Sequence, residues 1–288
     1  MAERKVVFIT GCSSGIGYEL LKLFNTAQYN VVGTALPKSS DALSADPIAQ
    51  ADNIQIESLD VKDFQAASTL ITKTEQRFGK IDILINNAGI SYRSVVEDMT
   101  PEDEQNQLAV NYLGAMHLIR CVLPTMRKRR SGRIINISSV GGMMAMPTMA
   151  SYSASKFALE GATESLWYET KPWNIHVSLV RPGFINSLAF EKVYYSSKRT
   201  SNQSEPSPYE EHYQNMTKFV GKMMKRTPCT SETVAKRIFQ VAQRKRPPLR
   251  TAGTPDARIF YIIRRLIPRR LYHILLYRSL PGIKRWGK

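Results

Sequence analysis

The sequence feature that most constrains the fold is a glycine-rich turn between the first apolar run and the first helical pattern. Residues 6–9 (VVFI) read as a buried strand, residues 10–17 (TGCSSGIG) follow at once, and helical spacing begins at Gly15. A strand, a tight glycine turn and a helix N-terminus in this order let backbone N–H groups and the helix dipole face a pyrophosphate. The turn therefore predicts a dinucleotide site.

Each glycine of this turn has a separate physical task. Gly11 permits the tight turn, Gly15 lets the backbone approach the pyrophosphate, and Gly17 lets the helix pack closely on the strand. The spacing is G-x-x-x-G-x-G, which differs from the more familiar G-x-G-x-x-G. The position directly after the first strand is what favours a nucleotide site over an ordinary turn.

Short apolar runs alternate with helical patterns through most of the chain. The expected strands are Lys5–Thr10, Asn30–Thr34, Ile54–Ser58, Ile81–Asn86, Gly132–Ile137 and Ile175–Val180. The expected helices are Gly15–Ala27, Lys62–Phe78, Glu102–Met126 and Tyr152–Glu169. Alternation of this kind implies parallel strands joined by right-handed crossovers, and nearly continuous apolar strands imply a sheet covered on both faces. We therefore expect an α/β fold, a three-layer Rossmann-type doubly wound parallel sheet.

The remaining sequence divides into a substrate lid and a basic extension. The helical and strand patterns weaken over residues 188–228, and long irregular inserts beyond a sheet are often functional lids. We expect residues 1–250 to form the catalytic domain with this lid, and residues 251–288 to form a basic helical C-terminal extension. In the extension, apolar residues recur at helical spacing: Ile259, Ile262, Ile263, Leu266, Leu271, Ile274 and Leu275.

Three residues suggest acid–base chemistry. Tyr152 and Lys156 are four positions apart and would share one face of a helix. A nearby ammonium stabilises a phenolate, so Tyr152 could exchange a proton with an alcohol or a carbonyl oxygen. Ser139 follows the strand at 132–137, at the carboxyl edge where ligands bind, and could hold the same oxygen.

Together these residues resemble the short-chain dehydrogenase/reductase family, in its compact single-domain branch and near its hydroxysteroid and retinol dehydrogenase-like members. The resemblance covers residues 5–185 and rests on motifs in the family's order. They are residues 10–17 (TGCSSGIG), 60–61 (DV), 86–89 (NNAG), Asn111, Ser139, Tyr152 with Lys156, and residues 182–185 (PGFI). Ser139 precedes Tyr152 by 13 positions, the family's usual spacing, which favours it over Ser138.

The resemblance implies direct hydride transfer without a metal. It implies a catalytic set of Asn111, Ser139, Tyr152 and Lys156, in which Asn111 supports a relay water and Lys156 lowers the pKa of Tyr152 and binds the nicotinamide ribose. The implied cofactor-binding residues are Gly11, Ser13, Ser14, Gly15, Ile16, Gly17, Asp60, Val61, Asn87, Ala88, Gly89, Tyr152, Lys156, Pro182, Gly183 and Ile185.

The choice between NAD and NADP depends on the residues after the second strand, where an acid favours NAD and a base favours NADP. Residues 34–38 read TALPK, so Ala35 offers no acid, Leu36 replaces an arginine common in relatives, and Lys38 could reach a 2′-phosphate. We expect NADP in preference to NAD. Asn186 and Ser187 stand where the family often has threonine, which leaves the nicotinamide amide contact open.

A lipophilic small-molecule substrate is expected, and the resemblance suggests a role in lipid metabolism. Candidate pocket residues, for which core packing is the alternative role, are Met143, Met144, Met146, Met149, Phe184, Phe190, Tyr194 and Tyr195. The protein is expected to be cytoplasmic, since three scattered cysteines favour a reducing compartment and no signal or membrane span is evident. It is also expected to form a homo-oligomer.

The net charge of +16 is concentrated near the C-terminus. Residues 244–288 hold 13 Lys and Arg residues against the single acid Asp256. The basic helical tail has three interpretations: a solvated face, a dimer contact, or a peripheral contact with a membrane surface. No recognisable nucleic-acid-binding module accompanies the charge, so nucleic acid is not an expected partner.

Two other functions compete with the oxidoreductase interpretation. A non-catalytic NAD(P)-binding sensor or interaction protein would need the glycine turn but not Asn111, Ser139, Tyr152 and Lys156 together. A sugar-nucleotide epimerase or dehydratase also uses a Tyr-x-x-x-Lys pair, but the glycine spacing and the modest C-terminal length speak against it.

Overall fold

A computed structural model, which describes residues 4–187, 193–198 and 207–287, has a seven-stranded parallel sheet at its centre. The strands lie in the order β3-β2-β1-β4-β5-β6-β7, and every neighbouring pair is parallel. Their bounds are β1 Val6–Ile9, β2 Asn30–Ala35, β3 Ile54–Ser58, β4 Ile83–Asn86, β5 Gly132–Ile137, β6 Ile175–Arg181 and β7 Arg250–Ala252. The expected doubly wound sheet is confirmed, and its direction of winding changes between β1 and β4.

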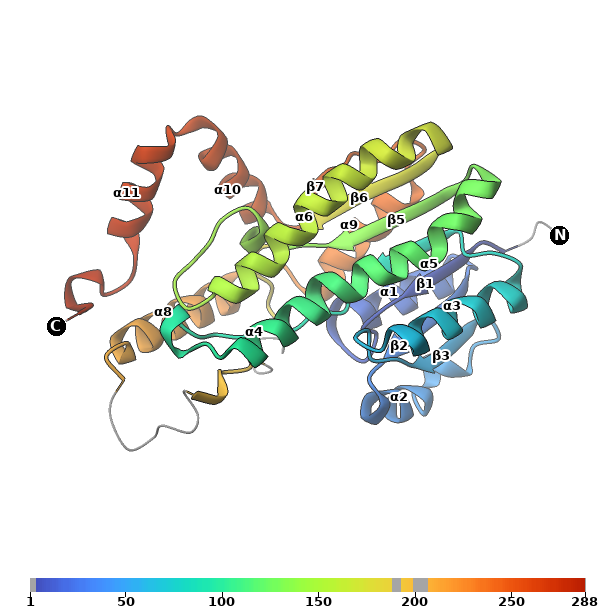
Figure 1. Cartoon of the computed structure of the whole chain (residues 1–288), viewed down its shortest axis with the longest axis horizontal. Helices are drawn as coiled ribbons and strands as arrows, with labels where there is room; N and C mark the ends of the chain where they lie inside the picture. Colours follow the sequence, from blue (N-terminus) through green and yellow to red (C-terminus); the bar gives the residue numbers. More distant parts are fainter. Residues whose placement is uncertain (1–3, 188–192, 199–206, 288) are drawn as a thin grey trace.

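Helices cover both faces of the sheet, which gives the three layers seen in Figure 1. The α-helices are α1 Gly15–Thr26, α2 Pro37–Ser44, α3 Phe64–Phe78, α4 Pro101–Leu108, α5 Gly114–Arg129, α6 Ala150–Thr170, α8 Glu210–Arg226, α9 Ser231–Gln243, α10 Pro255–Leu266 and α11 Arg269–Ser279. Short 3₁₀ turns are Pro47–Gln50, Val96–Asp98, Val140–Gly142, Lys171–Trp173 and Ile283–Arg285. Helices α3, α5 and α6 pack on one face, and α1 and α9 pack on the other.

The core consists of two apolar layers that share the strands. Alternate residues of β1 point to opposite faces, so Val7 and Ile9 pack under α1 and α9 while Val6 and Phe8 pack under α3 and α5. All four side chains are fully or almost fully buried. This explains why the strand has no polar position, since a sheet covered on both faces has no side that meets water.

The expected helix at 102–126 is instead two helices joined by a π-helical segment at Ala109–Leu113. A π segment is a rare single-turn bulge inside an α-helix, and the apolar spacing that predicts the helix contains no separate signal for it. Thr100 caps the N-terminus of α4 by accepting a hydrogen bond from the Asp103 amide, 3.2 Å away. The break in regular winding turns Asn111 into the molecule, where it is 2% exposed.

The segment at 188–228 is also more regular than the sequence suggested. Helix α8 occupies residues 210–226 and buries Tyr213, Met216 and Val220. These residues lie at three- and four-residue spacing, but the polar residues Gln214, Asn215, Thr217 and Lys218 between them hide the pattern. Residue Phe190, a predicted pocket residue, lies outside the described residues.

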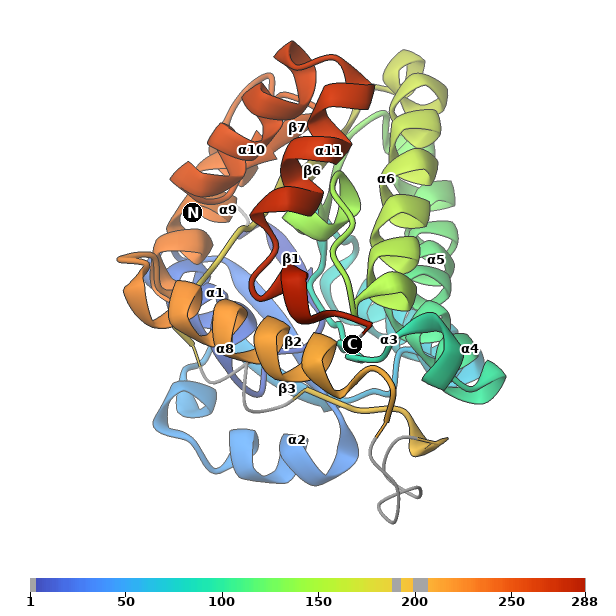
Figure 2. The ribbon, with the colours of Figure 1, turned by 90° about the vertical axis from the view of Figure 1, so that its left-hand side faces the viewer.

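The C-terminal extension is joined to the sheet. The predicted boundary between residues 250 and 251 falls inside β7, which pairs with β6, and the helices of the extension begin at α10. Figures 1 and 2 show α10 and α11 rising at the end of the molecule where α8 also lies, away from the N-terminus. Among the described helices, none has both the length and the apolar composition needed to cross a lipid bilayer.

Candidate active site

The glycine turn after β1 forms an open cradle at the carboxyl edge of the sheet. Gly11 and Gly15 have φ angles of 72° and 63°, in the left-handed region that glycine tolerates without strain. A Cβ atom on Gly17 would lie 2.1 Å from the carbonyl oxygen of Gly11, so only glycine allows α1 to begin so near the turn. Ser13, Ser14 and Gly15 are exposed, and the first turn of α1 contains no acidic residue. An anion such as a pyrophosphate fits this N-terminus.

The segment after β4 fastens this turn to the centre of the sheet. The Thr10 hydroxyl accepts hydrogen bonds of 3.0 Å from the amides of Asn87 and Ala88. The Asn87 side chain in turn donates to the carbonyl oxygens of Thr10 and Gly11, each at 3.0 Å. The predicted residues around Gly11 and Asn87 therefore come together, and the turn is held rigid from the neighbouring strand.

Asn111 occupies a buried position beside the lysine. Its amide group donates to the Ile90 carbonyl and to the Ser155 hydroxyl, both at 3.0 Å, and its oxygen accepts from the Ile90 amide at 2.9 Å. A Cβ atom on Gly89 would lie 3.3 Å from the Asn111 oxygen and 3.7 Å from Lys156 Nζ. A glycine at this position thus leaves the space between the two side chains open.

Tyr152 and Lys156 lie on α6 and meet the loop that follows β5. Ser139 and Tyr152 meet at Gly141, where a Cβ atom would lie 2.9 Å from the Tyr152 ring and 3.6 Å from the Ser139 hydroxyl oxygen. Lys156 is 5% exposed, its Nζ donates to the Ile137 carbonyl at 2.9 Å, and it lies 5.9 Å from the centre of the Tyr152 ring. Ser138 points elsewhere, since its hydroxyl donates to Glu160 at 2.8 Å. The structure thus brings Ser139, and not Ser138, to the tyrosine.

The surroundings of Tyr152 act on its pKa in opposite directions. Burial raises the pKa of Tyr152 above its ordinary value, while the hydrogen bond from Ser139 and the positive charge of Arg93 work to lower it. Burial also lowers the pKa of Lys156 to about 8, against the opposing charge of Glu160. A lysine with this pKa changes its protonation near neutral pH, which is where acid–base catalysis requires exchangeable protons.

Sequence reasoning missed two charged features near Tyr152 and Lys156. Arg93 is 7% exposed and lies close enough to Tyr152 to lower its pKa, although its surroundings contain no motif that marks it. Glu160 forms a buried ion pair with Arg181 at the end of β6, in which Arg181 Nε donates to Glu160 at 2.6 Å. A glutamate one turn beyond Lys156 could have raised the question, but its arginine partner is 21 positions away.

The loop after β6, predicted to lie near the nicotinamide, is fixed by the start of α10. The Thr254 hydroxyl accepts a hydrogen bond from the Gly183 amide, and the Asp256 carboxylate accepts one from the Phe184 amide, both at 2.8 Å. The Pro182 carbonyl accepts from the Val140 amide at 2.9 Å, which joins this loop to that of Ser139. The C-terminal extension therefore helps to shape the site.

The other predicted cofactor residues lie around the same edge. Ile185 and Ile16, the second residue of α1, pack against the core cluster on that face of the sheet, and Val61 is buried against Gly114. Asp60 is half-buried after β3, where its carboxylate accepts a 3.0 Å hydrogen bond from the Lys62 amide. Lys38 is exposed in the first turn of α2, just beyond β2.

On the substrate side, the predicted pocket residues divide into two groups. Met143 and Met144 are buried against Ala257 and Tyr272 of the extension and are therefore core residues. Met146 and Phe184 join a second apolar cluster with Met216 and Phe219 of α8 and Phe260 of α10. Met149 and Tyr195 are partly buried and Tyr194 is 50% exposed.

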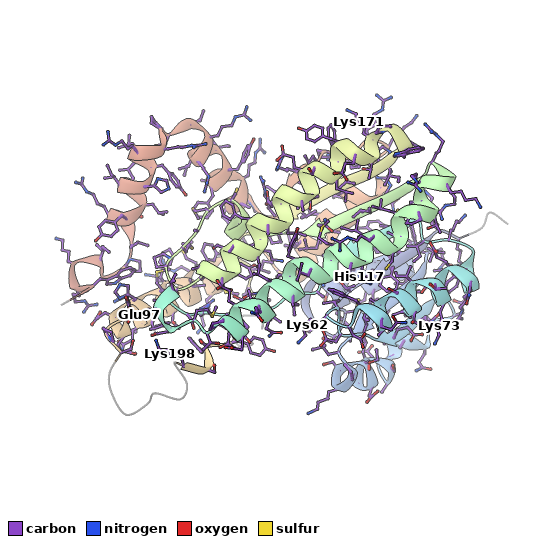
Figure 3. All side chains as sticks on the ribbon, in the orientation of Figure 1. Lys62, Lys73, Glu97, His117, Lys171 and Lys198 are labelled. Carbon is purple, nitrogen blue, oxygen red and sulfur yellow. The ribbon has the colours of Figure 1, made fainter. Side chains whose placement is uncertain are left out.

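Residues 193–198, in the segment predicted to be a lid, are attached to α4 and to the turn before it. The carboxylate of Asp103 is partly desolvated, but hydrogen bonds from Ser197, Thr100 and Ser196 outweigh that effect and lower its pKa to about 2. Lys198 lies against Glu97 in Figure 3 and donates to its carbonyl oxygen at 2.8 Å. Within the described ranges, no group of three His, Cys, Asp or Glu side chains is placed to hold a metal ion.

Comparisons with known proteins agree with this geometry. The profile of the short chain dehydrogenase family matches residues 5–197. The 3-ketodihydrosphingosine reductase of Bacteroides thetaiotaomicron is 32% identical over 259 residues, 90% of this chain and 91% of the relative. A solved short-chain dehydrogenase from Streptomyces avermitilis is 28% identical with a TM-score of 0.80, covering 97% of this chain and 98% of that one. The structure of ElxO with NADP bound is 26% identical with a TM-score of 0.71, covering 87% and 98%.

Proposed function

The chain belongs to the short chain dehydrogenase family, and from this premise we propose that it transfers a hydride between a nicotinamide cofactor and the oxygen-bearing carbon of a lipophilic ketone or alcohol, with Tyr152 as the proton donor and acceptor. Membership makes the chain an oxidoreductase that acts on CH–OH or keto groups with a nicotinamide cofactor. The sensor and epimerase alternatives are not favoured by the comparisons. The observation that carries the catalytic proposal is that Ser139 and Tyr152 meet at Gly141 while the buried Lys156 Nζ lies 5.9 Å from the centre of the Tyr152 ring.

In the proposed reaction the protein handles the proton and the oxygen. When bound, the nicotinamide supplies the hydride for reduction or accepts it for oxidation. In reduction, the Tyr152 phenol donates its proton to the substrate oxygen as negative charge develops there, and the Ser139 hydroxyl donates a hydrogen bond to the same oxygen. Lys156 and Arg93 then stabilise the phenolate that remains. Asn111 holds the Ser155 end of α6 in place and orders the space beside Lys156 for a relay water.

We assign the cofactor to the cradle after β1 and to the loops that follow β4, β5 and β6. The open left-handed backbone at Gly11 and Gly15 suits the pyrophosphate, and Asp60 and Val61 suit the adenine. Asn87, Ala88 and Gly89 line the approach to the nicotinamide half. NADP is proposed over NAD because Lys38 is exposed just after β2 and the segment before it contains no acid. A solved relative contains NADP, which is consistent with this preference.

We propose that the substrate is lipophilic because an apolar cluster that includes Met146 and Phe184 lies beside the catalytic loops. Met146 and Phe184 lie between the catalytic loop and α8, beside Phe219 and Phe260. The ring of Phe184 lies edge-on to the Phe219 ring, with 6.4 Å between their centres. A relative with 32% identity is named for the reduction of 3-ketodihydrosphingosine, which is a ketone with a long alkyl chain. Substrates of this kind are the first to test.

The test is the replacement Tyr152→Phe, with Tyr168→Phe as a matched control. Both tyrosines lie on α6, but Tyr168 is 62% exposed and far from the catalytic loop. We expect Tyr152→Phe to bind NADPH normally in a cofactor-fluorescence titration and to lose turnover of a panel of lipophilic ketones by about 10²- to 10⁴-fold. Tyr168→Phe should turn over like the unchanged protein.

Two results would contradict the proposal. Undiminished turnover by Tyr152→Phe would remove the tyrosine from the mechanism. Tight binding of NADPH by the unchanged protein without turnover of any ketone or alcohol on the panel would favour the non-catalytic alternative. Titration with NADH beside NADPH tests the cofactor preference in the same samples.

A further inference from the structure

The two C-terminal helices expose apolar side chains that the fold does not use. We call residues 255–287 the C-terminal arm; it contains α10, α11 and the turn at Ile283–Arg285. Along α10, large aliphatic residues recur at positions i, i+3, i+4 and i+7, and α11 repeats the first three positions of this pattern. The exposed fractions are 56% for Ile259, 43% for Ile262, 37% for Ile263, 74% for Leu266, 48% for Leu271, 47% for Ile274 and 47% for Leu275.

These exposed stripes are not the faces that attach the arm to the protein. Attachment uses a different set of side chains, namely Ala257, Phe260, Tyr272, Leu276, Leu280 and Trp286, which pack against the catalytic loop and α8. Each helix therefore has one apolar face that is satisfied and a second that meets water. Soluble monomers rarely leave an apolar surface of this kind uncovered, because exposure of each large aliphatic side chain costs free energy.

The charge on the arm is all of one sign. Between residues 257 and 288 the sequence contains no Asp or Glu. The arginines of this stretch that flank the apolar stripes are Arg258, Arg264, Arg265, Arg269, Arg270 and Arg278, and all six are exposed. Helices that combine an exposed aliphatic stripe with arginines, and without acids, match the chemistry of an anionic lipid surface.

We propose that the C-terminal arm docks the protein on the surface of an anionic lipid bilayer. The aliphatic stripes of α10 and α11 enter the boundary between headgroups and acyl chains, and the arginines pair with lipid phosphates and other anionic headgroups. The arm lies on the bilayer and does not cross it. This inference goes beyond the catalytic proposal and does not depend on it.

A second copy of the chain is a poorer occupant of the same surface. In a two-fold contact through these faces, the six arginines of one copy would meet the same six on the other, and no acid of the arm is present to compensate them. Juxtaposed like charges oppose association of proteins. The same charges strengthen the attraction to an anionic bilayer, because each cation near its surface adds to binding.

The position of the arm is consistent with interfacial catalysis. Figure 2 looks onto the end of the molecule where α8, α10 and α11 gather, beyond the carboxyl edge of the sheet. Tyr272 of the arm packs on Met143 and Met144, which follow Ser139, and Phe260 packs near Phe184. A bilayer bound to the arm would lie on the side of the protein where the proposed substrate pocket is built.

The experiment is co-sedimentation of the full-length protein with vesicles, which needs no turnover. One vesicle preparation contains phosphatidylcholine alone, and the other contains phosphatidylcholine mixed with phosphatidylglycerol. Two arm variants are compared with two controls at exposed sites elsewhere, one that replaces an aliphatic residue by serine and one that removes three positive charges. The arm variants are Ile262→Ser with Leu266→Ser, and Arg265→Gln with Arg269→Gln and Arg270→Gln; the controls are Val96→Ser, and Arg244→Gln with Lys245→Gln and Arg246→Gln.

We expect the unchanged protein to bind the anionic vesicles and not the neutral ones. Removal of three arm cations should weaken vesicle binding by about 100-fold, since each cation contributes roughly fivefold. The serine variant should lose binding by at least about tenfold, while both controls bind like the unchanged protein.

Three results would overturn the proposal. They are failure of the unchanged protein to bind anionic vesicles, an equal loss in the charge control at residues 244–246, and unchanged vesicle binding by the serine variant. If that variant instead converts a dimer to a monomer in sedimentation velocity, the arm is a contact between copies of the chain. Failure of the catalytic proposal would leave all of these readouts unaffected.

Discussion

The buried ammonium of Lys156 should leave a measurable mark on the stability of the protein as pH is changed. Its Nζ has a backbone carbonyl as its hydrogen-bond partner, and desolvation lowers its pKa from 10.5 to about 8. Replacement by methionine keeps the length and apolar volume of the side chain but removes the titrating group. The perturbation is therefore Lys156→Met, examined without cofactor.

The direction of the stability change follows from the protonation of Lys156 in the folded and the unfolded protein. Below pH 8 both the folded and the unfolded protein hold the proton on Lys156. Between about 8 and 10.5 the folded protein has released the proton and the unfolded protein has not. The unfolded state then binds more protons, so the free energy of unfolding rises with pH over this interval. At about 1.4 kcal/mol for each pH unit, the rise amounts to roughly 3 kcal/mol.

The assay is urea unfolding of the unchanged protein and of Lys156→Met at several pH values from 7.5 to 11, compared as a difference between the two curves. Burial raises the pKa of Cys12 from 9.0 to about 12, which destabilises both proteins above pH 9 and cancels in the difference. Lys73→Met is the control, because Lys73 is exposed on α3, as Figure 3 shows. Its curve should run parallel to that of the unchanged protein.

A difference between the unchanged protein and Lys156→Met that stays constant over this range would refute the reasoning. Lys156 would then titrate as an ordinary exposed lysine, and the argument that burial adjusts it for proton exchange near neutral pH would be wrong.

Two further predictions concern the turn and the buried ion pair. Gly17→Ala should weaken NADPH binding by about 100-fold or more in a fluorescence titration, since the new Cβ would overlap the Gly11 carbonyl. The control is Gly161→Ala, whose Cβ would have no atom within 4 Å; this variant should bind NADPH normally and gain about 0.5–1 kcal/mol of stability in urea unfolding. Normal NADPH binding by Gly17→Ala would contradict the prediction. Glu160→Ala should lower the free energy of unfolding by about 3–5 kcal/mol, because it leaves the buried Arg181 charge without its ion-pair partner. The double variant Glu160→Met with Arg181→Met should recover most of this loss. Equal losses of stability in the single and double variants would contradict the prediction.

The parts of the fold that the sequence could predict are those set by local patterns. The apolar run at 6–9 and the glycines that follow it determine a strand, a turn and a helix start without reference to the rest of the chain. By contrast, β7 has only three residues, Arg250–Ala252, and no apolar alternation that would mark it. This strand forms because it pairs with the free edge of β6, and that edge is present only once the sheet has assembled.

The candidate site shows the same limit. The turn, the Asn87 segment and the Tyr152–Lys156 pair follow from spacing and family resemblance, and their roles in catalysis and binding stay predictions. Arg93 lies outside every such pattern, although its charge bears directly on Tyr152. Its position depends on pairing between the loop after β4 and the chain after β6, where its amide donates to the Tyr194 carbonyl at 2.8 Å. Contacts over about one hundred positions leave no local signature.

These long-range contacts also determine how the C-terminal arm has to be tested. Helix α10 has Asp256 in its first turn, where the carboxylate accepts a hydrogen bond from the Phe184 amide, and residues 251 and 252 belong to the sheet. Even a deletion from residue 258 onward would uncover Met143 and Met144 by removing Tyr272. Truncation would therefore damage the proposed pocket and the proposed membrane contact together. Substitutions confined to the outer face of α10 and α11 separate the two, because Ile262 and Leu266 meet solvent while Ala257 and Tyr272 stay in place.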